Sequence, residues 1–422
     1  MSPAPAPRAG ATSITFLRCG TSQFVPDWVH CDFYTVHGGF HRGHPGDCVV
    51  RILLVGDEAS LSAELLDFIA DLGEEWQPLT AADGQTAMSI VSASPVDAVI
   101  ACPTLPDLTA TTLLGQIRTL RPETIRIALV EAPQGNRPPP ARLIGVAHRF
   151  LPLPLAPEVL LEALTSLEEL RELLDSERLR SAIGRIEKLP SPPHLYLSLT
   201  QALEHDDDTD TADVAKLVSA DPAIAAKVLQ LSNSAFFNSG RTISDLRSAV
   251  TRLGLATLRD LVLASEVFSA SALSGAERNA LQQRALLASR LAAKLLPESS
   301  AELGATAALL ADIGLLLPGV RNERTEPASD ADPRPGHSEA GAYLLGLWGL
   351  PMPIIEAVAF HLQPQRSNTR SFWVTGAVHV ALALVNGDPV DEEYLQRAGV
   401  LGKLPQWRDH ANGLMGLATA DA

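Results

Sequence analysis

The chain has 422 residues, of which 46% are hydrophobic, and it carries a formal net charge of −16. It is too long for one ordinary core, so we expect two or three domains. The negative charge argues against a sequence-independent grip on nucleic-acid phosphates and against binding to an anionic membrane surface, so we expect neither nucleic acid nor membrane as a partner.

The cysteines and the apolar runs bear on the compartment in which the protein works. Three of the four cysteines precede residue 49, which is not the pattern of a disulfide framework. We find no apolar run long enough to span a bilayer, and residues 1–10 lack the apolar core of a secretory signal. We therefore expect a cytoplasmic location.

Residues 1–48 are rich in Pro, Gly and His and show no convincing period, so we expect a disordered or irregular extension. Upstream sequence that does not belong to the native protein would look the same. A zinc site is the alternative, but the cysteines and histidines here match no tetrahedral pattern of closely paired ligands. The residues concerned are Cys19, Cys31, His37, His41, His44 and Cys48.

Residues 49–155 alternate short apolar runs, rich in β-branched residues, with segments of helical spacing. This alternation predicts a parallel sheet covered by helices on both faces, which is a doubly wound α/β domain. The expected strands are 49–55, 76–81, 98–101, 125–130 and 149–151, and the expected helices are 60–72, 85–92, 109–120 and 139–146.

Residues 156–187 predict one long amphipathic helix with leucines on one side and charged residues on the other. Leu167, Leu170 and Leu174 fit a short coiled-coil seam, but fewer than three clean heptads are present. Two interpretations stay open. The segment 156–188 is either the last helix of the sheet domain extended as a connector, or part of a homodimer interface that also uses the sheet domain.

From residue 189 onward we find no strand pattern of any strength, and apolar residues at helical spacing dominate. We expect an all-α domain at 189–390 with a loop at 321–336, and a C-terminal tail at 391–422. The expected helices are 195–203, 211–219, 222–233, 245–253, 257–270, 276–296, 301–310, 338–347, 353–360 and 372–384.

Residues 50–165 resemble the receiver domain of two-component response regulators, which has a flavodoxin-like fold. Val55-Gly56-Asp57-Glu58 stands at the family's acidic turn, Leu105-Pro106 at its Met-Pro and Leu153-Pro154 at its Lys-Pro. When the functional positions of the receiver family are matched one by one to this sequence, one chemical group is kept, the carboxylate of Asp57. Gly56 replaces the first acidic residue, Cys102 the phosphoacceptor aspartate, Val130 the serine or threonine, and Leu153 the lysine.

These replacements predict a receiver-like domain that cannot be phosphorylated. One carboxylate is a poor Mg²⁺ site, because the ion needs several oxygen ligands in an octahedron. Without the ion, the lysine and an acceptor carboxylate, an aspartyl phosphate cannot form. Cys102 could act as a redox sensor, but no Lys or His lies near it in the sequence to stabilise a thiolate. The alternative is a small buried residue at a strand end.

Residues 189–390 resemble the HDOD domain, a helical output module related to HD-type phosphohydrolases. After a proline-rich start, four signatures occur in register: Asp-Pro-x-Ile, Asn-Ser-Ala-Phe, Arg-Leu-Gly and Trp-Gly-Leu-Pro. We expect the second signature to order a helix end by side-chain hydrogen bonds, with a binding surface as the alternative. The signature residues are Asp221, Pro222, Asn233, Ser234, Gly254, Trp348 and Pro351, and the tryptophan is expected to be a core anchor.

The resemblance also implies where a metal would bind. The catalytic branch of the HD superfamily uses an adjacent His-Asp pair and further histidines to hold metal that activates water against a phosphoester. Here the pair reads Ala311-Asp312, so its histidine is gone. His337, His361 and His379 persist at matching places, but at most Asp312, His337 and His361 can be assembled. Since a metal needs three or four ligands in one geometry, we expect no metal, no cofactor and no catalytic residue.

The two resemblances together predict a cytoplasmic, response-regulator-like signal-transduction protein. A phosphorylation-incompetent pseudo-receiver would be coupled to a non-catalytic HDOD module, and the protein would act by contact with signalling proteins that the sequence does not name. Two alternatives stay open. One is a metal-dependent phosphodiesterase acting on a nucleotide such as a cyclic dinucleotide, and the other is a phosphorelay receiver of a two-component system.

Overall fold

The computed structural model describes residues 50–420, with gaps at 58–62, 72–75, 132–140, 175, 185, 187–188, 191–210, 235–241, 256–257, 259–267, 270–273, 330 and 368–370. The elements named below all belong to the unit formed by residues 48–422. Our predictions for residues 1–48 and for a helix at 195–203 lie outside the described residues, as does most of the helix expected at 257–270.

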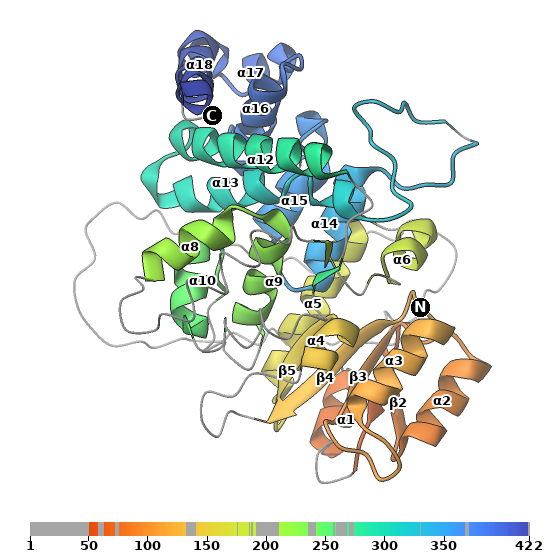
Figure 1. Ribbon diagram of the computed structural model, residues 1–422. Helices are drawn as coiled ribbons and strands as arrows, with labels where there is room; N and C mark the ends of the chain where they lie inside the picture. Colours follow the sequence, from red (N-terminus) through yellow and green to blue (C-terminus); the bar gives the residue numbers. More distant parts are fainter. Residues whose placement is uncertain are drawn as a thin grey trace, which may run out of the picture. The chain divides into compact units, whose positions relative to one another are not determined.

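Five parallel strands form the sheet of the first half, in the order β2-β1-β3-β4-β5 (Figure 1). Val55 at the end of β1 pairs with Ala81 on one side and with Ala101 on the other, so the carboxyl ends of these strands meet at one edge. This order is that of flavodoxin-like doubly wound sheets and agrees with the expected α/β domain. The strands are β1 (Val50–Val55), β2 (Trp76–Ala81), β3 (Ala98–Ala101), β4 (Ile125–Glu131) and β5 (Arg149–Leu153).

The helices that connect the strands bury their apolar sides. Leu113, Leu114 and Ile117 are all fully buried, which the helical spacing of the segment predicts. Asp83 starts the second of these helices, because its carboxylate accepts from the Thr86 N–H at 2.7 Å. The helices are α1 (Ala63–Asp71), α2 (Gly84–Ala93), α3 (Ala110–Leu120), α4 (Ala141–Val146) and α5 (Pro157–Leu173).

The prediction of one long helix over 156–187 is wrong, because the structure has two, α5 and α6 (Glu177–Gly184). Leu174 is the C-cap of α5. Ser176 then starts α6, since its hydroxyl accepts from the Leu179 N–H at 3.4 Å, a local bond that competes with helix continuation. The turn between the helices lets both Leu174 and Leu179 be buried.

The leucines of the possible coiled-coil seam pack inside the chain. Leu167, Leu170 and Leu174 are each at most 5% exposed. Leu170 lies against α14, where a methyl group added to Gly346 would collide with its side chain. These leucines therefore contribute to the protein's own core, and a homodimer through this segment stays a prediction.

The second half is helical, and its described α-helices from α8 to α16 begin and end within three residues of the expected bounds, whereas the short helices η1 and η2 were not predicted. Asp221 and Ser274 show why: both accept hydrogen bonds from free N–H groups of a first helical turn, and Ser274 forms a capping box with Glu277. The elements are α8 (Thr211–Ser219), α9 (Pro222–Ser232), α10 (Leu246–Leu253), α12 (Gly275–Leu295), α13 (Glu298–Leu310), η1 (Ile313–Leu316), α14 (His337–Leu347), α15 (Met352–Phe360), η2 (Pro364–Arg366) and α16 (Val374–Asn386).

Two short strands contradict the expectation of no strand after residue 189. β6 (Leu189–Pro190) and β7 (Phe268–Ser269) pair in parallel. The second strand also lies inside the segment 257–270, so the prediction of a helix there is wrong at those residues. Two-residue strands carry no periodicity from which the sequence could predict them.

The segment 391–422, which we expect to be a tail, contains further helices: α17 (Glu392–Arg397), η3 (Leu401–Lys403) and α18 (Leu404–Ala420). Trp407 stacks on Phe372 with ring centroids 4.9 Å apart, and it is 4% exposed. This aromatic contact and the apolar residues around it fasten the C-terminal helices to the preceding ones.

Among the described residues, the stretch Glu298–Leu316 is long and apolar enough to cross a membrane by length and composition, which the sequence reading does not predict. Its mean hydropathy is 1.2, and 61% of the stretch is buried inside the protein. Burial of this kind is also found in the core helix of a folded domain.

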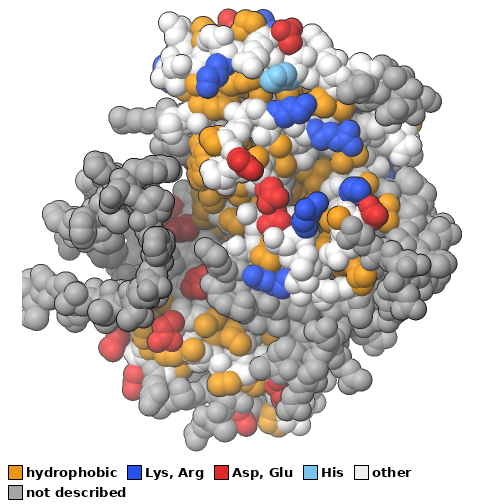
Figure 2. All heavy atoms as spheres, turned by 90° about the vertical axis from the view of Figure 1, so that its left-hand side faces the viewer, with side chains coloured by type: hydrophobic (Ala, Val, Ile, Leu, Met, Phe, Trp, Pro, Cys, Tyr) orange, Lys and Arg blue, Asp and Glu red, His pale blue; other side chains and the backbone are white. Residues whose placement is uncertain are grey.

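Positive charge gathers locally on this acidic chain. Figure 2 shows a face of the molecule on which Lys and Arg side chains gather in the upper and middle part. In the helical half, Arg247 of α10 and Arg290 and Lys294 of α12 are exposed. The net charge of −16 therefore describes the whole chain and not each of its surfaces.

Candidate functional site

Positions that carry phosphoryl chemistry in receiver domains lie at the carboxyl edge of the sheet. The Gly56 N–H donates to the Ala81 carbonyl at 3.0 Å, and the Cys102 N–H donates to the Val55 carbonyl at 2.9 Å. Gly56 and Cys102 thus follow neighbouring strands, as the sequence predicts. The Cys102 side chain is buried with 2% exposure, which is the environment of a packing residue and not of a reactive thiolate.

Val130 and Leu153 complete this edge of the sheet. Val130 pairs with Pro152, and Leu153 pairs with Glu131. Both apolar side chains belong to the hydrophobic core or pack against it. Asp57 is exposed, and within the described ranges no group of three metal-ligating side chains forms at this edge. The described residues of this edge therefore do not cluster the anionic oxygens that Mg²⁺ needs.

A second candidate site forms where η1 packs against α14. Gly314 lets these elements touch, because a methyl group there would collide with the backbone carbonyl of His337. Gly341 of α14 faces the same contact. Asp312 precedes η1, His337 opens α14 and His361 follows α15, so this close approach brings three side chains from separate elements together.

Asp312, His337 and His361 offer ligand atoms that all lie within 4.8 Å of one another. The Oδ1 of Asp312 is 3.5 Å from the Nε2 of His337 and 3.5 Å from the Nε2 of His361. All three side chains are buried, with exposures of 4% or less. The structure thus brings together the three residues that the sequence could assemble.

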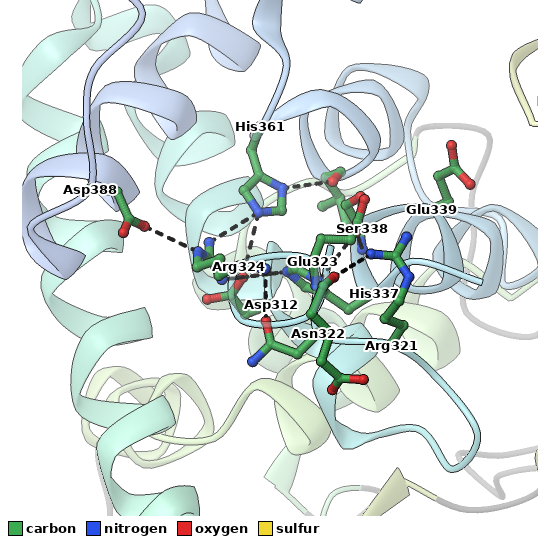
Figure 3. Close-up of polar contacts among 12 residues, drawn as sticks. Asp312, Arg321, Asn322, Glu323, Arg324, His337, Ser338, Glu339, His361 and Asp388 are labelled. Atoms are coloured by element: carbon green, nitrogen blue, oxygen red, sulfur yellow. Dashed lines mark hydrogen bonds and ion pairs between the residues drawn. The ribbon is translucent and has the colours of Figure 1, made fainter. Parts of the chain in front are cut away.

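The guanidinium of Arg324 occupies the centre of this triad (Figure 3). Its Nη1 lies 2.7 Å from the Oδ1 of Asp312 and 3.4 Å from the Nε2 of His337, and its Nη2 lies 3.2 Å from the Nε2 of His361. On the other side, its Nε is 3.3 Å from a carboxylate oxygen of Asp388. A divalent ion would have to share this space with a fixed positive charge, so the residues do not fit a metal.

The hydrogen bonds of His361 determine which of its nitrogens faces Arg324. Its Nδ1 lies 2.8 Å from the Val358 carbonyl and therefore carries a proton. Burial lowers the pKa of His361, and the negative charge of Asp312 opposes this only in part. The ring is therefore neutral near neutral pH, and its Nε2 lone pair accepts from the guanidinium.

His337 lies between two carboxylates. Its Nε2 faces Asp312, and its Nδ1 is 3.2 Å from a carboxylate oxygen of Glu323. Burial lowers the pKa of His337, but the hydrogen bonds to Asp312 and Glu323 outweigh burial and raise it. The protonated ring donates from both nitrogens. When the ring is neutral, the Glu323 N–H, 3.2 Å from Nδ1, can donate to it instead.

Asp312 stays ionised although it is buried. Burial raises its pKa, but the hydrogen bond from His337 and the charge of Arg324 hold the pKa of Asp312 well below its usual range. The carboxylates of Asp312 and Glu323 are thus balanced by cations that the chain itself supplies. Because the negative charge of these carboxylates is already balanced, a metal ion is not needed to compensate for it.

The remaining residues of the HD pattern have structural roles. Ala311, which stands where the paired histidine would be, is fully buried. The Nδ1 of His379 donates to the His361 carbonyl at 2.8 Å, and its Nε2 accepts from the Asp391 N–H at 2.9 Å. Since both nitrogens of His379 are used, this ring offers no ligand to a metal.

The HDOD signature residues on α9 order helix ends. Asp221 accepts from the N–H groups of Ala223 and Ile224 at 2.7 and 3.0 Å, and Pro222 takes the first helical position. Asn233 bonds to Ile243 twice, accepting from its N–H at 2.7 Å and donating to its carbonyl at 2.8 Å. The expected ordering role of the asparagine thus has a geometric basis.

The other signature residues end or begin helices. The Ser234 hydroxyl donates to the Leu231 carbonyl at 2.6 Å. Gly254 ends α10 with a φ of 75°, which favours glycine. Trp348 is the C-cap of α14 and is 6% exposed, and Pro351 is the N-cap of α15. These hydrogen bonds and caps are within the protein and support the expected ordering of helix ends.

The sequence singles out neither Arg324, which is 15% exposed, nor Lys227, which is buried. Arg324 falls in a segment that the sequence predicts to be a loop. The one sequence feature that could have drawn attention to it is the polar run 321–324, which follows the apolar segment around η1. Lys227 lies inside α9, with its Nζ 3.0 Å from the Oε1 of Gln230 and 4.1 Å from the ring centroid of Trp348. Burial lowers the pKa of Lys227 to about 7. The Gln230 amide donates to the His148 carbonyl at 3.1 Å, which ties α9 to the sheet domain.

Comparison with known proteins identifies the helical half of the chain. The HDOD domain family matches the chain at residues 189–364, so an HDOD domain is present there. A protein of Treponema pallidum (strain Nichols) is 29% identical over 205 residues, which cover 43% of this chain. The match spans 39% of the length of that relative.

Two solved structures are also similar to the chain. The MmoQ response regulator of Methylococcus capsulatus is 20% identical, with a TM-score of 0.41, and the match covers 51% of this chain and 97% of that one. The signal receiver domain of an HD domain-containing protein from Pseudomonas fluorescens is 27% identical, with a TM-score of 0.27, and the match covers 31% of this chain and 95% of that one.

Proposed function

We propose that the protein is a non-catalytic, cytoplasmic signal-transduction regulator that acts by contact with other proteins. In this proposal the receiver-like domain is not phosphorylated, and the HDOD domain is the output module. The observation that carries the proposal is the position of the Arg324 guanidinium within hydrogen-bonding distance of Asp312 and His361.

Phosphoester hydrolysis by the HD arrangement needs a metal with an open position for water. Here Arg324 supplies the positive charge between the would-be ligands, and it brings neither water nor an open coordination position. Asp312, His337 and His361 are at most 4% exposed, so a phosphoester has little access to them. Both features support a scaffold that has kept the shape of the site without its chemistry.

The sheet domain supports the same proposal independently. Cys102 stands where a phosphoryl acceptor would be, and its thiol cannot form an aspartyl phosphate. Leu153 stands where a lysine would stabilise the phosphoryl group. A domain of this kind responds, in our proposal, to a bound partner and not to a phosphoryl group.

Metal analysis of the purified chain tests the proposal at the HD-like site. We expect iron, manganese and zinc to be far below one ion per chain, and no hydrolysis of bis-p-nitrophenyl phosphate or of cyclic dinucleotides when Mn²⁺ is added. Stoichiometric metal that is lost in His361→Ala, together with hydrolysis, would overturn it.

The metal-dependent phosphodiesterase is the second candidate. One observation favours it, the convergence of Asp312, His337 and His361 within 4.8 Å. It requires Arg324 to leave the site. The same metal analysis separates the two functions, because the enzyme must retain metal in the wild-type chain.

Incubation with acetyl phosphate and Mg²⁺, followed by intact mass spectrometry, tests the sheet domain. We expect no added phosphoryl group on the wild-type chain. A gain of one phosphoryl group that disappears in Asp57→Asn would instead assign a phosphorelay function to the domain.

A further inference from the structure

A groove lies where α5 faces the turn between α14 and α15. Its volume is about 680 Å³, and its walls come from β5, α5, the end of α9 and residues 348–352. This size is in the range of sites that bind a ligand or a short segment of a partner. The groove takes no part in the HD-like triad, so its occupant needs a separate argument.

One wall of the groove is acidic. Glu158, Glu162 and Glu169 of α5 line it, and all three are exposed. Within the described part of the chain, none of the three carboxylates forms an ion pair or a side-chain hydrogen bond. They extend over 12 residues of one helix, from position 158 to position 169, which is about 16 Å or three turns.

Apolar side chains lie between and opposite these carboxylates. Leu161 is 41% exposed, which makes it one of two large hydrophobic side chains with substantial exposure among the described residues. Leu350 and Met352 line the groove from the helical half. An apolar strip beside a row of carboxylates is complementary to an amphipathic segment with basic residues.

The floor of the groove holds a cation, Arg149. Four of its five N–H donors are used within the protein: Arg149 donates to the carbonyls of Leu347, Ala163 and Gly346 at 3.1, 3.2 and 2.6 Å, and to the Ser166 hydroxyl at 3.0 Å. Its positive charge also interacts with the carboxylate of Glu162. Three carboxylates against one guanidinium leave the charge of these groove residues negative.

From this arrangement we propose that the groove binds a basic amphipathic segment of a partner protein, about three helical turns long. The basic residues of that segment face Glu158, Glu162 and Glu169, and an apolar residue packs on Leu161. An anionic ligand meets three carboxylates, so the charges do not favour it.

The proposal rests on the proposed function, because it names the kind of protein contact through which a non-catalytic regulator would work. Its test uses the full chain and two labelled peptides of about 12 residues, which is enough for three turns. One peptide has leucines on one face and lysines and arginines on the other. The second has glutamates in place of the basic residues.

Fluorescence anisotropy measures binding to the wild-type chain and to two variants with equal loss of charge. The groove variant is Glu158→Gln/Glu162→Gln/Glu169→Gln. The matched control is Glu298→Gln/Glu302→Gln/Glu393→Gln, whose glutamates are exposed and lie outside the groove. We expect the basic peptide to bind the groove variant about tenfold more weakly, because three exposed ion pairs each add modestly, and to bind the control with unchanged affinity.

A second pair of variants tests the apolar contact. Leu161→Asp changes the groove, whereas Leu120→Asp changes a leucine on α3 that is 46% exposed and lies outside it. We expect the first variant to weaken binding of the basic peptide and the second to leave it unchanged. Circular dichroism of all four variants checks that they are folded like the wild type.

Three results would overturn the proposal. An equal loss of affinity for the basic peptide in the groove variant and in its matched control would show that the peptide is attracted diffusely to an acidic chain. Equal binding of the glutamate peptide, or no binding of the basic one, would remove the charge argument. Loss of self-association in the groove variant, measured by sedimentation, would assign the groove to a second copy. The metal and hydrolysis measurements are separate, so failure of this proposal leaves the proposed function standing.

Discussion

Arg324 shows at the scale of one residue how a ligand-like cluster can be closed by the chain itself. Its side chain is 15% exposed and contacts Asp312, His337 and His361. Unlike an exchangeable metal, a guanidinium remains attached to its backbone and is always charged. The buried carboxylate of Asp312 therefore has a permanent partner.

Removal of that partner gives the first prediction. In Arg324→Ala the charge of Asp312 is left buried beside two imidazoles, and we expect a loss of roughly 3 kcal/mol in the free energy of unfolding. Added Mn²⁺ or Zn²⁺ should restore part of this loss, because the ligand atoms are then free. Thermal melts with and without metal measure both effects.

The matched controls are the wild-type chain and Arg324→Ala/His361→Ala. Neither should be stabilised by the metal, the first because Arg324 occupies the site and the second because a ligand is missing. Equal stabilisation of the wild type would mean that the guanidinium does not exclude a metal.

His337 gives a prediction about pH. Its pKa is raised in the folded protein above the ordinary 6.5, so the folded state keeps a proton that the unfolded chain releases. This contribution to stability is complete below the unfolded pKa and is lost as the pH rises through the folded one. We expect the stability difference between the wild type and His337→Gln to be larger at about pH 6 than at about pH 9. Urea unfolding at both values measures it, and a difference independent of pH would contradict the raised pKa.

At the scale of elements, the site depends on how closely η1 approaches α14. Gly314 leaves no room for a Cβ, because the backbone of His337 is already there. Gly314 is therefore as important to the geometry of the site as the side chains of Asp312, His337 and His361. Local sequence does not reveal this contact, since the two elements are separated by the segment 317–336.

Gly314→Ala tests the close packing of η1 against α14. Overpacking against a backbone carbonyl should cost about 1–3 kcal/mol and move His337 away from Asp312. The matched control is Gly413→Ala in α18, where a methyl group meets nothing within 4 Å and helix propensity favours alanine. Chemical denaturation compares the two, and equal stability of both variants would contradict the tight contact.

At the scale of the whole molecule, Arg149 joins β5 to the last turn of α14. Burial lowers its pKa to about 10, so it remains charged at neutral pH. It donates to four oxygens, two of them almost 200 residues away in sequence. The sheet domain and the HDOD domain therefore share a hydrogen-bonded junction that includes a buried charge.

Arg149→Met tests this junction. The substitution keeps an apolar stem but leaves carbonyl acceptors unpaired, so we expect a loss of roughly 3 kcal/mol and separate melting of the two domains. Differential scanning calorimetry should show one transition for the wild type and a broadened or split one for the variant. Arg290→Met, which changes an exposed arginine of α12, is the control and should melt like the wild type.

The sequence alone predicted the five strands of the sheet β2-β1-β3-β4-β5 and most of the described helices, because their signals are local. The run Ala98–Ala101 is wholly apolar, and Asp221 with Pro222 marks the start of α9 within two residues. The degenerate receiver positions and the three residues Asp312, His337 and His361 were also readable, since each replaces or keeps a residue type at a recognisable place in a motif.

Only the tertiary structure decided where the helix over 156–187 breaks, that the segment 391–422 is helical, and that Arg324 enters the triad. The last two depend on contacts between residues far apart in sequence, Trp407 on Phe372 and Arg324 with His361. A helical period or a motif reports what a segment prefers by itself. It cannot report which distant charge will balance a buried carboxylate, because that is determined by where the folded chain places the cation.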